Sequence, residues 1–85
     1  MTDPSARSAA ITRKIAALLH VHEAKVTPDA TLESLGGDSL SVLVIAMEIE
    51  EDWGFTFGKG EIESFRTVAD VLDAVAWHRK DRRHG

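Results

Sequence analysis

The chain has 85 residues, of which 44% are hydrophobic and 28% charged, and its formal net charge at pH 7 is −4. A chain of this length is expected to form one small domain, 1–85, which buries only about 60% of the surface that its unfolded form exposes, so a deep catalytic cleft is not expected. Cysteine is absent, which excludes disulfides, thiolate metal sites and a cysteine nucleophile, and no apolar run reaches the roughly 18 residues of a transmembrane helix.

The first predicted helix covers about residues 5–20. Asp3 and Pro4 suit its start, because Asp can cap free backbone N–H groups and Pro is tolerated at the first helical position. Residues 1–10 lack the basic-then-apolar order of a signal peptide, and we therefore expect a cytoplasmic protein. One apolar face repeats with helical spacing at Ile11, Ile15, Leu18 and Leu19.

A long loop is predicted over residues 21–38, where the helical period fades. Turn signals interrupt it at residues 27–29 and at the pair Gly36-Gly37. A loop of this length in a compact domain is usually functional or disordered, and its spaced apolar residues favour a functional loop that is held against the core. These residues are Val21, Val26, Leu32 and Leu35.

The clearest helix covers residues 39–53, with Asp38 or Ser39 as its cap and Gly54 at its end. At about 100° per residue, its apolar side chains fall into two stripes on opposite sides of the helix. The first stripe, which we assign to the core, contains Val42, Ile45, Ala46, Ile49 and Trp53. The second stripe contains Leu40, Leu43, Val44 and Met47.

The second stripe is a candidate docking face. Three helices can cover only part of a neighbour, so we expect this stripe to be at least partly exposed. Glu51 extends the stripe, and Glu48 and Glu50 flank it. Exposed apolar side chains ringed by acidic groups are typical of surfaces that bind other proteins.

The rest of the chain predicts one short helical turn and a final helix. A break at residues 58–60 precedes the turn at 61–65. The final helix, 67–78, opens with a variant capping box from Thr67 to Asp70. No segment alternates with period two, so the sequence predicts an all-α fold. It is a small four-helix bundle of three main helices and one short helix, with a long loop between the first two.

Other notable residues are given structural interpretations. Trp53 and Trp77 are expected to pack at the core-facing edges of their helices. His20 and His22 have no third ligand in view, so no metal site is predicted. Residues 79–85 carry four basic residues and one acid, a net charge of +3, and are expected to form a solvated, frayed end. The remaining −7 on residues 1–78 disfavours nucleic acid and favours protein partners with basic surfaces.

Ser39 has two interpretations that the local sequence leaves open. A serine that follows Gly36-Gly37 and Asp38 is, in most unrelated sequences, a helix cap. In the other interpretation it is an attachment point, because a phosphate on Ser39 would meet the unpaired N–H groups and the positive dipole end of the helix. Asp38 would then hold Mg²⁺ during phosphoryl-group transfer, since hard cations take carboxylate oxygens.

The motif Gly37-Asp38-Ser39-Leu40, followed by a helix that ends in Glu-Glu-Asp-Trp-Gly-Phe (50–55), resembles the acyl carrier proteins, a family of phosphopantetheine-binding carriers. The resemblance extends from the first helix to about Trp77. Further residues that stand where the family places them are Asp29, Leu32, Leu35, Thr67 and Val68.

This resemblance implies a carrier that is not itself an enzyme. Ser39 would hold 4′-phosphopantetheine through a phosphodiester, with an acyl chain on the thiol of the arm as a thioester. Asp38 would help to position the metal of a phosphopantetheinyl transferase. The other implied partners are acyl-loading, condensing and acyl-transferring enzymes, and the carrier is expected to be a monomer. Together with the second stripe, the resemblance assigns partner binding to Leu40, Leu43, Val44, Met47, Glu48 and Glu51.

The class of cargo stays open. Val44 stands where fatty-acid carriers commonly have an acid, so partners would rely less on charge at this position. The pair Gly36-Gly37 is shared with the peptidyl and aryl carriers of nonribosomal synthesis. Fatty-acid, polyketide and aminoacyl pathways are therefore all compatible with the sequence.

Two alternatives come from other classes of protein. Residues 37–40 also spell the GDSL esterase motif, and residues 81–84 spell its Asp-x-x-His partner. Against an esterase, the chain has no Asn for that family's oxyanion block, no hydrophobic strand before Gly37, and too few residues for the α/β scaffold. The second alternative, a helical adaptor that docks partners without modification, has no special need for a hydroxyl at position 39.

Overall fold

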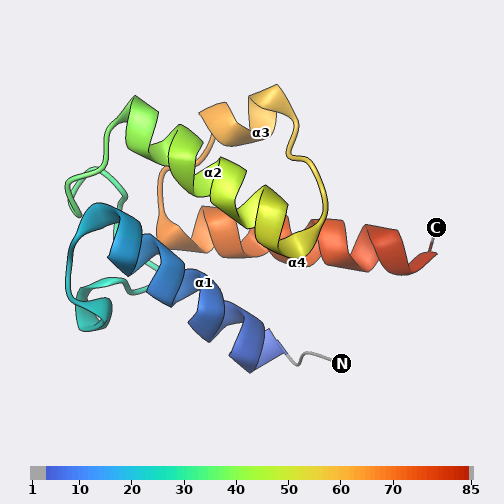
Figure 1. Ribbon diagram of the computed structural model, residues 1–85, viewed down its shortest axis with the longest axis horizontal. Coiled ribbons are helices and arrows are strands. Elements are labelled where there is room, and N and C mark those ends of the chain that lie inside the picture. Colours follow the sequence, from blue (N-terminus) through green and yellow to red (C-terminus); the bar gives the residue numbers. More distant parts are fainter. Residues whose placement is uncertain (1–3, 85) are drawn as a thin grey trace.

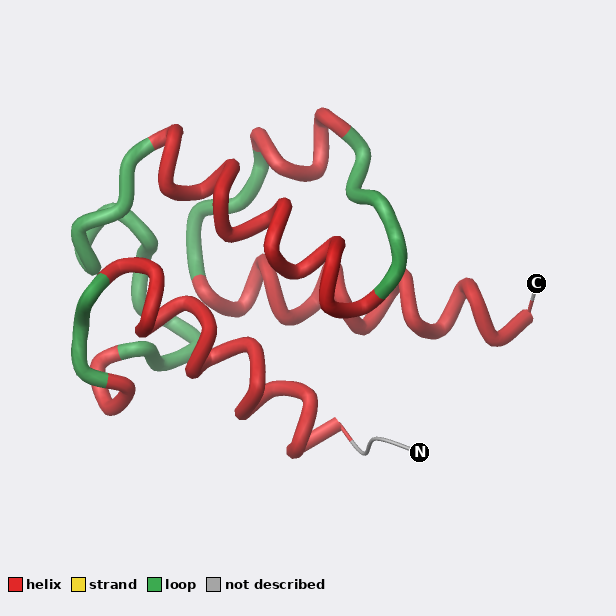
Figure 2. Tube along the Cα trace, viewed as in Figure 1, coloured by secondary structure: helices red, strands yellow, loops and turns green. Residues whose placement is uncertain are grey.

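The computed structural model describes the backbone of residues 4–84 and the side chains of residues 6–79. Its elements are α1 (Pro4–Leu19), the 3₁₀ helix η1 (Glu23–Lys25), α2 (Ser39–Trp53), α3 (Lys59–Glu63) and α4 (Val68–His84), as Figures 1 and 2 show. The predicted all-α fold, with three main helices, a short one and a long loop between the first two, is confirmed. None of the helices within residues 4–84 has the length and apolar character needed to cross a membrane.

An apolar core lies between α1, α2, α4 and the long loop. The stripe of α2 that was assigned to the core is confirmed, because its middle residues are fully buried and Val42 and Trp53 at its ends are half-buried. The loop is held by the apolar residues expected to hold it, with only Val21 less than fully buried. The buried core consists of Ile11, Ile15, Ala16, Val26, Leu32, Leu35, Ile45, Ala46, Ile49, Phe57, Phe65, Val68, Val71 and Val75.

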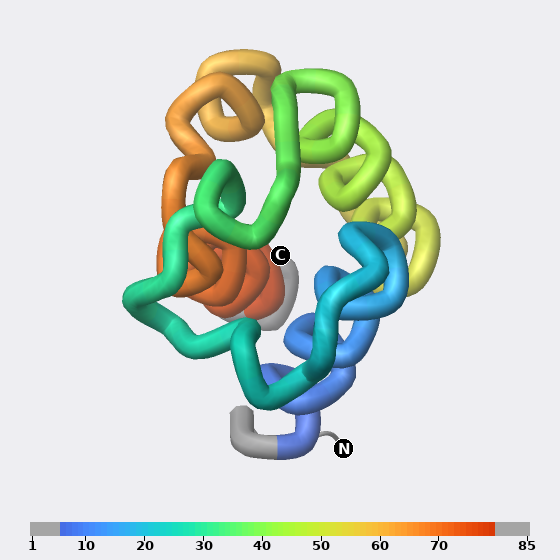
Figure 3. The backbone as a smooth tube through the Cα atoms, turned by 90° about the vertical axis from the view of Figure 1, so that its left-hand side faces the viewer, coloured from blue at the N-terminus to red at the C-terminus, as the bar shows by residue number. Residues whose placement is uncertain are grey.

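The loop between α1 and α2 covers one end of the bundle. Figure 3 looks onto this end, and Figure 1 places the loop on the side away from the end of α4. Backbone hydrogen bonds attach the loop to the start of α4. The Leu32 N–H donates to the Arg66 carbonyl at 2.8 Å, and the Val68 N–H donates to the Ala30 carbonyl at 3.0 Å. The segment that leads into α2 is therefore held in place by residues at the start of α4.

The starts of α3 and α4 are both capped by acidic side chains. α3 begins at Lys59, before the expected turn, because Gly58 is its N-cap and donates its N–H to Glu61 Oε1 at 2.7 Å. The capping box predicted for α4 is confirmed. In it the Thr67 N–H donates to Asp70 Oδ2 at 3.0 Å, and the Asp70 N–H donates to Thr67 Oγ1 at 3.1 Å.

α4 continues to His84, past the end predicted at residue 78. The apolar pattern stops where contact with the core stops, whereas the helix itself needs only the absence of a breaker, and no Gly or Pro lies between residues 78 and 84. The side chains of residues 80–85, including the Asp-x-x-His sequence, lie outside the described part of the chain. So does Asp3, the expected cap of α1.

The expected packing of Trp77 is wrong, because its side chain is 61% exposed. His78 takes the inward position instead, since it follows the buried Val75 by three residues and so shares its face of α4. The imidazole of His78 stacks on Phe55, with ring centroids 4.7 Å apart, and its Nε2 lies 2.9 Å from Glu61 Oε1. This contact joins α4 to α3.

Candidate functional site

Asp38, and not Ser39, is the N-cap of α2. Its backbone is extended, and its Oδ1 accepts hydrogen bonds from the Ser41 N–H at 2.9 Å and from Ser41 Oγ at 3.0 Å. The first of these bonds is the main reason that the pKa of Asp38 lies below its ordinary value of 3.8. Ser39 is the first helical residue and is exposed, and its hydroxyl forms no hydrogen bond with the described residues. The interpretation of Ser39 as a cap is therefore wrong.

The two glycines before Asp38 fix the position of this helix start. Gly36 has φ +92°, a left-handed conformation that favours glycine. Gly37 donates its N–H to the Leu32 carbonyl at 2.8 Å, and a Cβ on Gly37 would lie only 2.9 Å from the same oxygen. The backbone geometry therefore explains why a glycine stands at each of the two positions.

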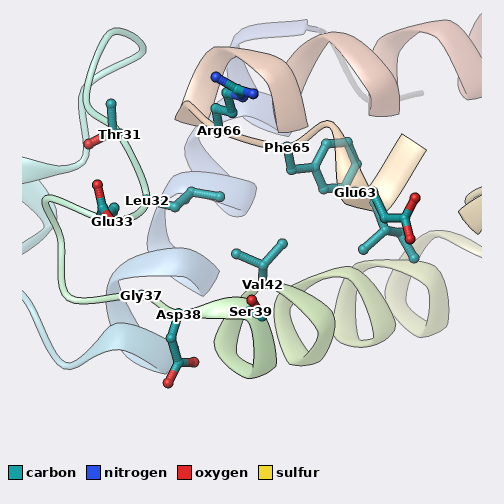
Figure 4. Close-up of a pocket in the computed structure, with 11 residues that line it drawn as sticks. Thr31, Leu32, Glu33, Gly37, Asp38, Ser39, Val42, Glu63, Phe65 and Arg66 are labelled. Atoms are coloured by element: carbon teal, nitrogen blue, oxygen red, sulfur yellow. The ribbon is translucent and has the colours of Figure 1, made fainter. Parts of the chain in front are cut away.

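Ser39 stands at the edge of an open cleft of about 880 Å³ between α2, α3 and the loop. In Figure 4, Val42 points into this cleft from α2, while the carboxylate of Asp38 points away from it. The cleft has an apolar floor and a polar rim. The floor consists of Leu32, Val42, Ile62 and Phe65, and the rim of Thr31, Glu33, Glu63 and Arg66.

Comparison with known proteins decides the family. Residues 9–75 match the family model of the phosphopantetheine attachment site. The chain belongs to this family of carrier proteins. An acyl carrier protein of Rubrobacter xylanophilus is 39% identical over 62 residues, which cover 72% of this chain and 76% of that protein. An acyl carrier protein of Clostridium perfringens is 34% identical over 65 residues, covering 75% of this chain and 86% of that one.

Membership of the family has direct consequences for the chemistry of the chain. The carrier holds 4′-phosphopantetheine covalently, is modified by a phosphopantetheinyl transferase and serves client enzymes, and it is not a catalyst itself. The surroundings of Ser39 fit such a group. They offer an exposed hydroxyl without a partner among the described residues, the start of a 15-residue helix, and an adjoining cleft.

The outer side of α2 is exposed, as the sequence predicted. The exposed fractions are 69% for Leu40, 42% for Leu43, 38% for Val44 and 56% for Met47. Glu51 is exposed among them, and we call these five residues the outer stripe. Glu48 is exposed at the edge of the outer stripe.

Sequence reasoning missed that Glu48, Glu50 and Asp52 of α2 make contacts within the carrier. Lys14 on α1 places its Nζ 2.8 Å from Asp52 Oδ2 and 3.2 Å from Glu48 Oε1. These hydrogen bonds, that of Asp52 first, raise the pKa of Lys14. Glu50 accepts a hydrogen bond from the Phe57 N–H at 2.8 Å, so it holds the link to α3. The available signal was the i, i+4 spacing of Glu48 and Asp52, which puts both carboxylates on one edge of α2.

The histidines near the end of α1 are exposed. His22 accepts a hydrogen bond at Nδ1 from the Ala24 N–H at 3.1 Å and so caps η1. His20 ends the turn after α1 with φ 58°. Among the side chains that the structure describes, no group of three or more His, Asp or Glu is arranged to hold a metal ion.

Proposed function

We propose that Ser39 is the attachment residue and that the chain is an acyl carrier protein. It would present acyl intermediates as thioesters to partner enzymes of fatty-acid, polyketide or related biosynthesis. The observation that carries the proposal is that Asp38 and Ser39 have different roles at the start of α2. Asp38 caps the helix, which leaves the Ser39 hydroxyl exposed and without a hydrogen bond to the described residues.

Each residue at the helix start has a defined task in this proposal. Ser39 Oγ forms the new bond to phosphorus when the phosphopantetheinyl group is transferred from coenzyme A, the hydroxyl proton is lost, and 3′,5′-ADP leaves. Asp38 remains ionised and exposed, so that its carboxylate supports Mg²⁺ in the complex with the transferase. When bound, the cofactor supplies a flexible arm with a terminal thiol that holds the cargo.

The cleft and the outer stripe have separate tasks. The apolar floor of the cleft, at Leu32, Val42, Ile62 and Phe65, is the place where a cargo chain can leave water. The outer stripe and Glu48 are the surface that partner enzymes contact. These side chains are exposed and do not belong to the buried core. The monomeric state and the cytoplasmic location stay predictions.

A peptidyl or aryl carrier of nonribosomal synthesis is the alternative within the same family. The pair Gly36-Gly37 suggested it, but the backbone accounts for both glycines whatever the cargo. The relatives named above are acyl carrier proteins, which favours an acyl cargo. The intact mass of the carrier isolated from its own organism, before and after hydroxylamine cleavage of thioesters, gives the mass of the cargo and separates the two.

The attachment is tested with coenzyme A, Mg²⁺ and a promiscuous phosphopantetheinyl transferase, followed by intact mass. Wild type should gain one phosphopantetheinyl group, and Ser39→Ala should gain none. Ser41→Ala is the matched control, because Ser41 is the neighbouring serine of the same turn and its hydroxyl is bonded to Asp38. No adduct on wild type, or an adduct on Ser39→Ala, would overturn the proposal.

One further variant separates a carrier from an unmodified adaptor. Ser39→Asp keeps a polar side chain at the start of α2 but removes the hydroxyl. A carrier loses its ability to supply acyl groups to a client enzyme with this change. An adaptor would keep its activity, and that result would contradict the proposal.

A further inference from the structure

We infer that Lys14, by pairing with acidic residues of α2, determines which partners bind the outer stripe. The partner that fits is an enzyme surface that is apolar and carries one basic side chain. The inference rests on the proposed role of the outer stripe in docking. Its evidence is the set of contacts that the acidic residues of α2 make within the chain.

Acidic residues stand along both edges of the outer stripe, but contacts inside the chain occupy them. On the edge next to α1, Lys14 lies within 3.2 Å of both Glu48 and Asp52, so one cation offsets two carboxylates. On the edge next to α3, Glu50 is half-buried and is bonded to the Phe57 N–H at 2.8 Å. A basic partner would therefore have to compete with bonds that already exist.

At the start of the helix, Asp38 Oδ1 accepts both hydrogen bonds from Ser41, which leaves Oδ2 for the metal-supporting role proposed above. Glu51 is different, since it is exposed and forms no ion pair or hydrogen bond with the side chains that the structure describes. The outer stripe thus offers four apolar side chains and one open carboxylate.

The surroundings of Glu51 indicate which basic side chain of a partner would bind there. A shallow hollow of about 410 Å³ lies beside it, lined by Met47, Phe55, Thr56 and the three glutamates of this part of α2. The alkyl part of a lysine or arginine fits against Met47 and Phe55 while its charged end reaches Glu51. An apolar groove on the partner would then cover Leu40, Leu43 and Val44.

The salt dependence of docking distinguishes this surface from a purely acidic one. Raising NaCl from about 0.1 M to about 1 M shortens the Debye length from about 10 Å to about 3 Å, which weakens contacts between exposed charges but not apolar burial. Docking through the outer stripe should therefore depend little on salt. Removal of the charge on Lys14 should release Glu48 and Asp52 and increase that dependence.

The experiment measures KM for the apo carrier with a promiscuous phosphopantetheinyl transferase at these two salt concentrations. For wild type, KM should change less than about threefold, because only one exposed charge pair is involved. Lys14→Gln should have a lower KM at low salt and lose this advantage at high salt. Met47→Ala should raise KM about tenfold at both concentrations, as expected for an apolar anchor.

Arg13→Gln is the matched control for charge. Arg13 is exposed on the same helix and forms no ion pair with the described side chains, so its removal changes the net charge equally without releasing Glu48 or Asp52. It should behave as wild type. Lys14→Met, which keeps the alkyl chain, replaces Lys14→Gln if the latter loses its helical circular dichroism.

The results separate the inference from the proposed function. No adduct on wild type at any salt concentration contradicts the carrier proposal itself. Modification that proceeds but shows equal salt dependence in wild type, Arg13→Gln and the Lys14 variants overturns the role of Lys14. Unchanged KM in Met47→Ala overturns the apolar docking mode.

Discussion

The starts of α2 and α4 both combine an acid with a hydroxyl, but only one of them leaves the hydroxyl unused. At α4, Thr67 Oγ1 accepts the Asp70 N–H, and Asp70 accepts the Thr67 N–H in return. Two loop carbonyls take up the next donors, among them that of Pro28, which accepts the Ala69 N–H at 2.9 Å. At α2, Asp38 alone provides the side-chain cap, and Ser39 stays exposed.

The difference shows that a hydroxyl at a helix start is not in itself an attachment site. The α4 start is closed on every side, because its donors are bonded to Asp70, Thr67 and the loop. The α2 start faces solvent and a cleft. A hydroxyl that carries a covalent group cannot also serve as a structural hydrogen-bond partner. Ser39 meets this condition among the described residues, whereas Thr67 does not.

The largest expected effect comes from the residue that ties the two helix starts together. Leu32 is 2% exposed, lies in the loop before α2 and is bonded to the backbone before α4. Leu32→Ala should lower the free energy of unfolding by about 2 to 5 kcal/mol, because it leaves a cavity in the core. Urea unfolding measures this. Leu40→Ala, in which the lost side chain is 69% exposed, should change the free energy by less than about 0.5 kcal/mol.

An intermediate effect is expected at the closed start of α4. Asp70→Ala removes the acceptor of the Arg66 and Thr67 N–H groups and should cost about 1 kcal/mol near neutral pH. The bond from Thr67 first, then that from Arg66, lowers the pKa of Asp70 below its ordinary value of 3.8. The stabilisation is therefore fully present above that ordinary value and is lost as the pH falls through the lower, folded-state pKa.

Urea unfolding of wild type and Asp70→Ala from about pH 6 to about pH 3 tests this sign. The two free energies should differ at the upper end and converge as the pH falls. Asp73→Ala is the control, since Asp73 is exposed on the same helix and makes no contact of this kind with the described residues. A difference that grows toward low pH would contradict the prediction.

The smallest expected effect concerns the open start of α2. A phosphodiester on Ser39 places a negative charge at the positive end of a 15-residue helix, so the modified carrier should be more stable than the apo form by about 0.3 to 1 kcal/mol at low ionic strength. Thermal unfolding of both forms measures it. The gain should shrink at high salt, whereas a gain that is independent of salt would come from other contacts of the arm.

The sequence predicted well those features that depend on one helix at a time. The bounds of α2, its two stripes and the capping box of α4 all follow from local spacing, and the structure has them as expected. Spacing did not decide between Asp38 and Ser39 as the cap, because both residues can accept the same N–H groups. Only the direction of the backbone into the helix settles that choice in favour of Asp38.

The features that were missed depend on which surfaces meet. The apolar period ended near residue 78 because the core ended there, so the helix was predicted too short. Trp77 was expected at the core-facing edge of its helix, although its position on α4 faces solvent, and His78 was overlooked. The pairing of Lys14 with α2 joins residues that are far apart in the chain. The local spacing of Glu48 and Asp52 places two carboxylates on one edge of α2 but does not identify the cation that they meet.

The direction in which the Ser39 side chain points is set by the backbone at Gly37. The Gly37 N–H is bonded to the Leu32 carbonyl, and that oxygen leaves no room for a Cβ. A designer who wants to transplant the attachment serine to another helical scaffold would therefore have to move residues 31–42 as one piece. A serine introduced alone would point in the direction set by the backbone of the new scaffold. The turn before the serine must therefore be transferred together with it.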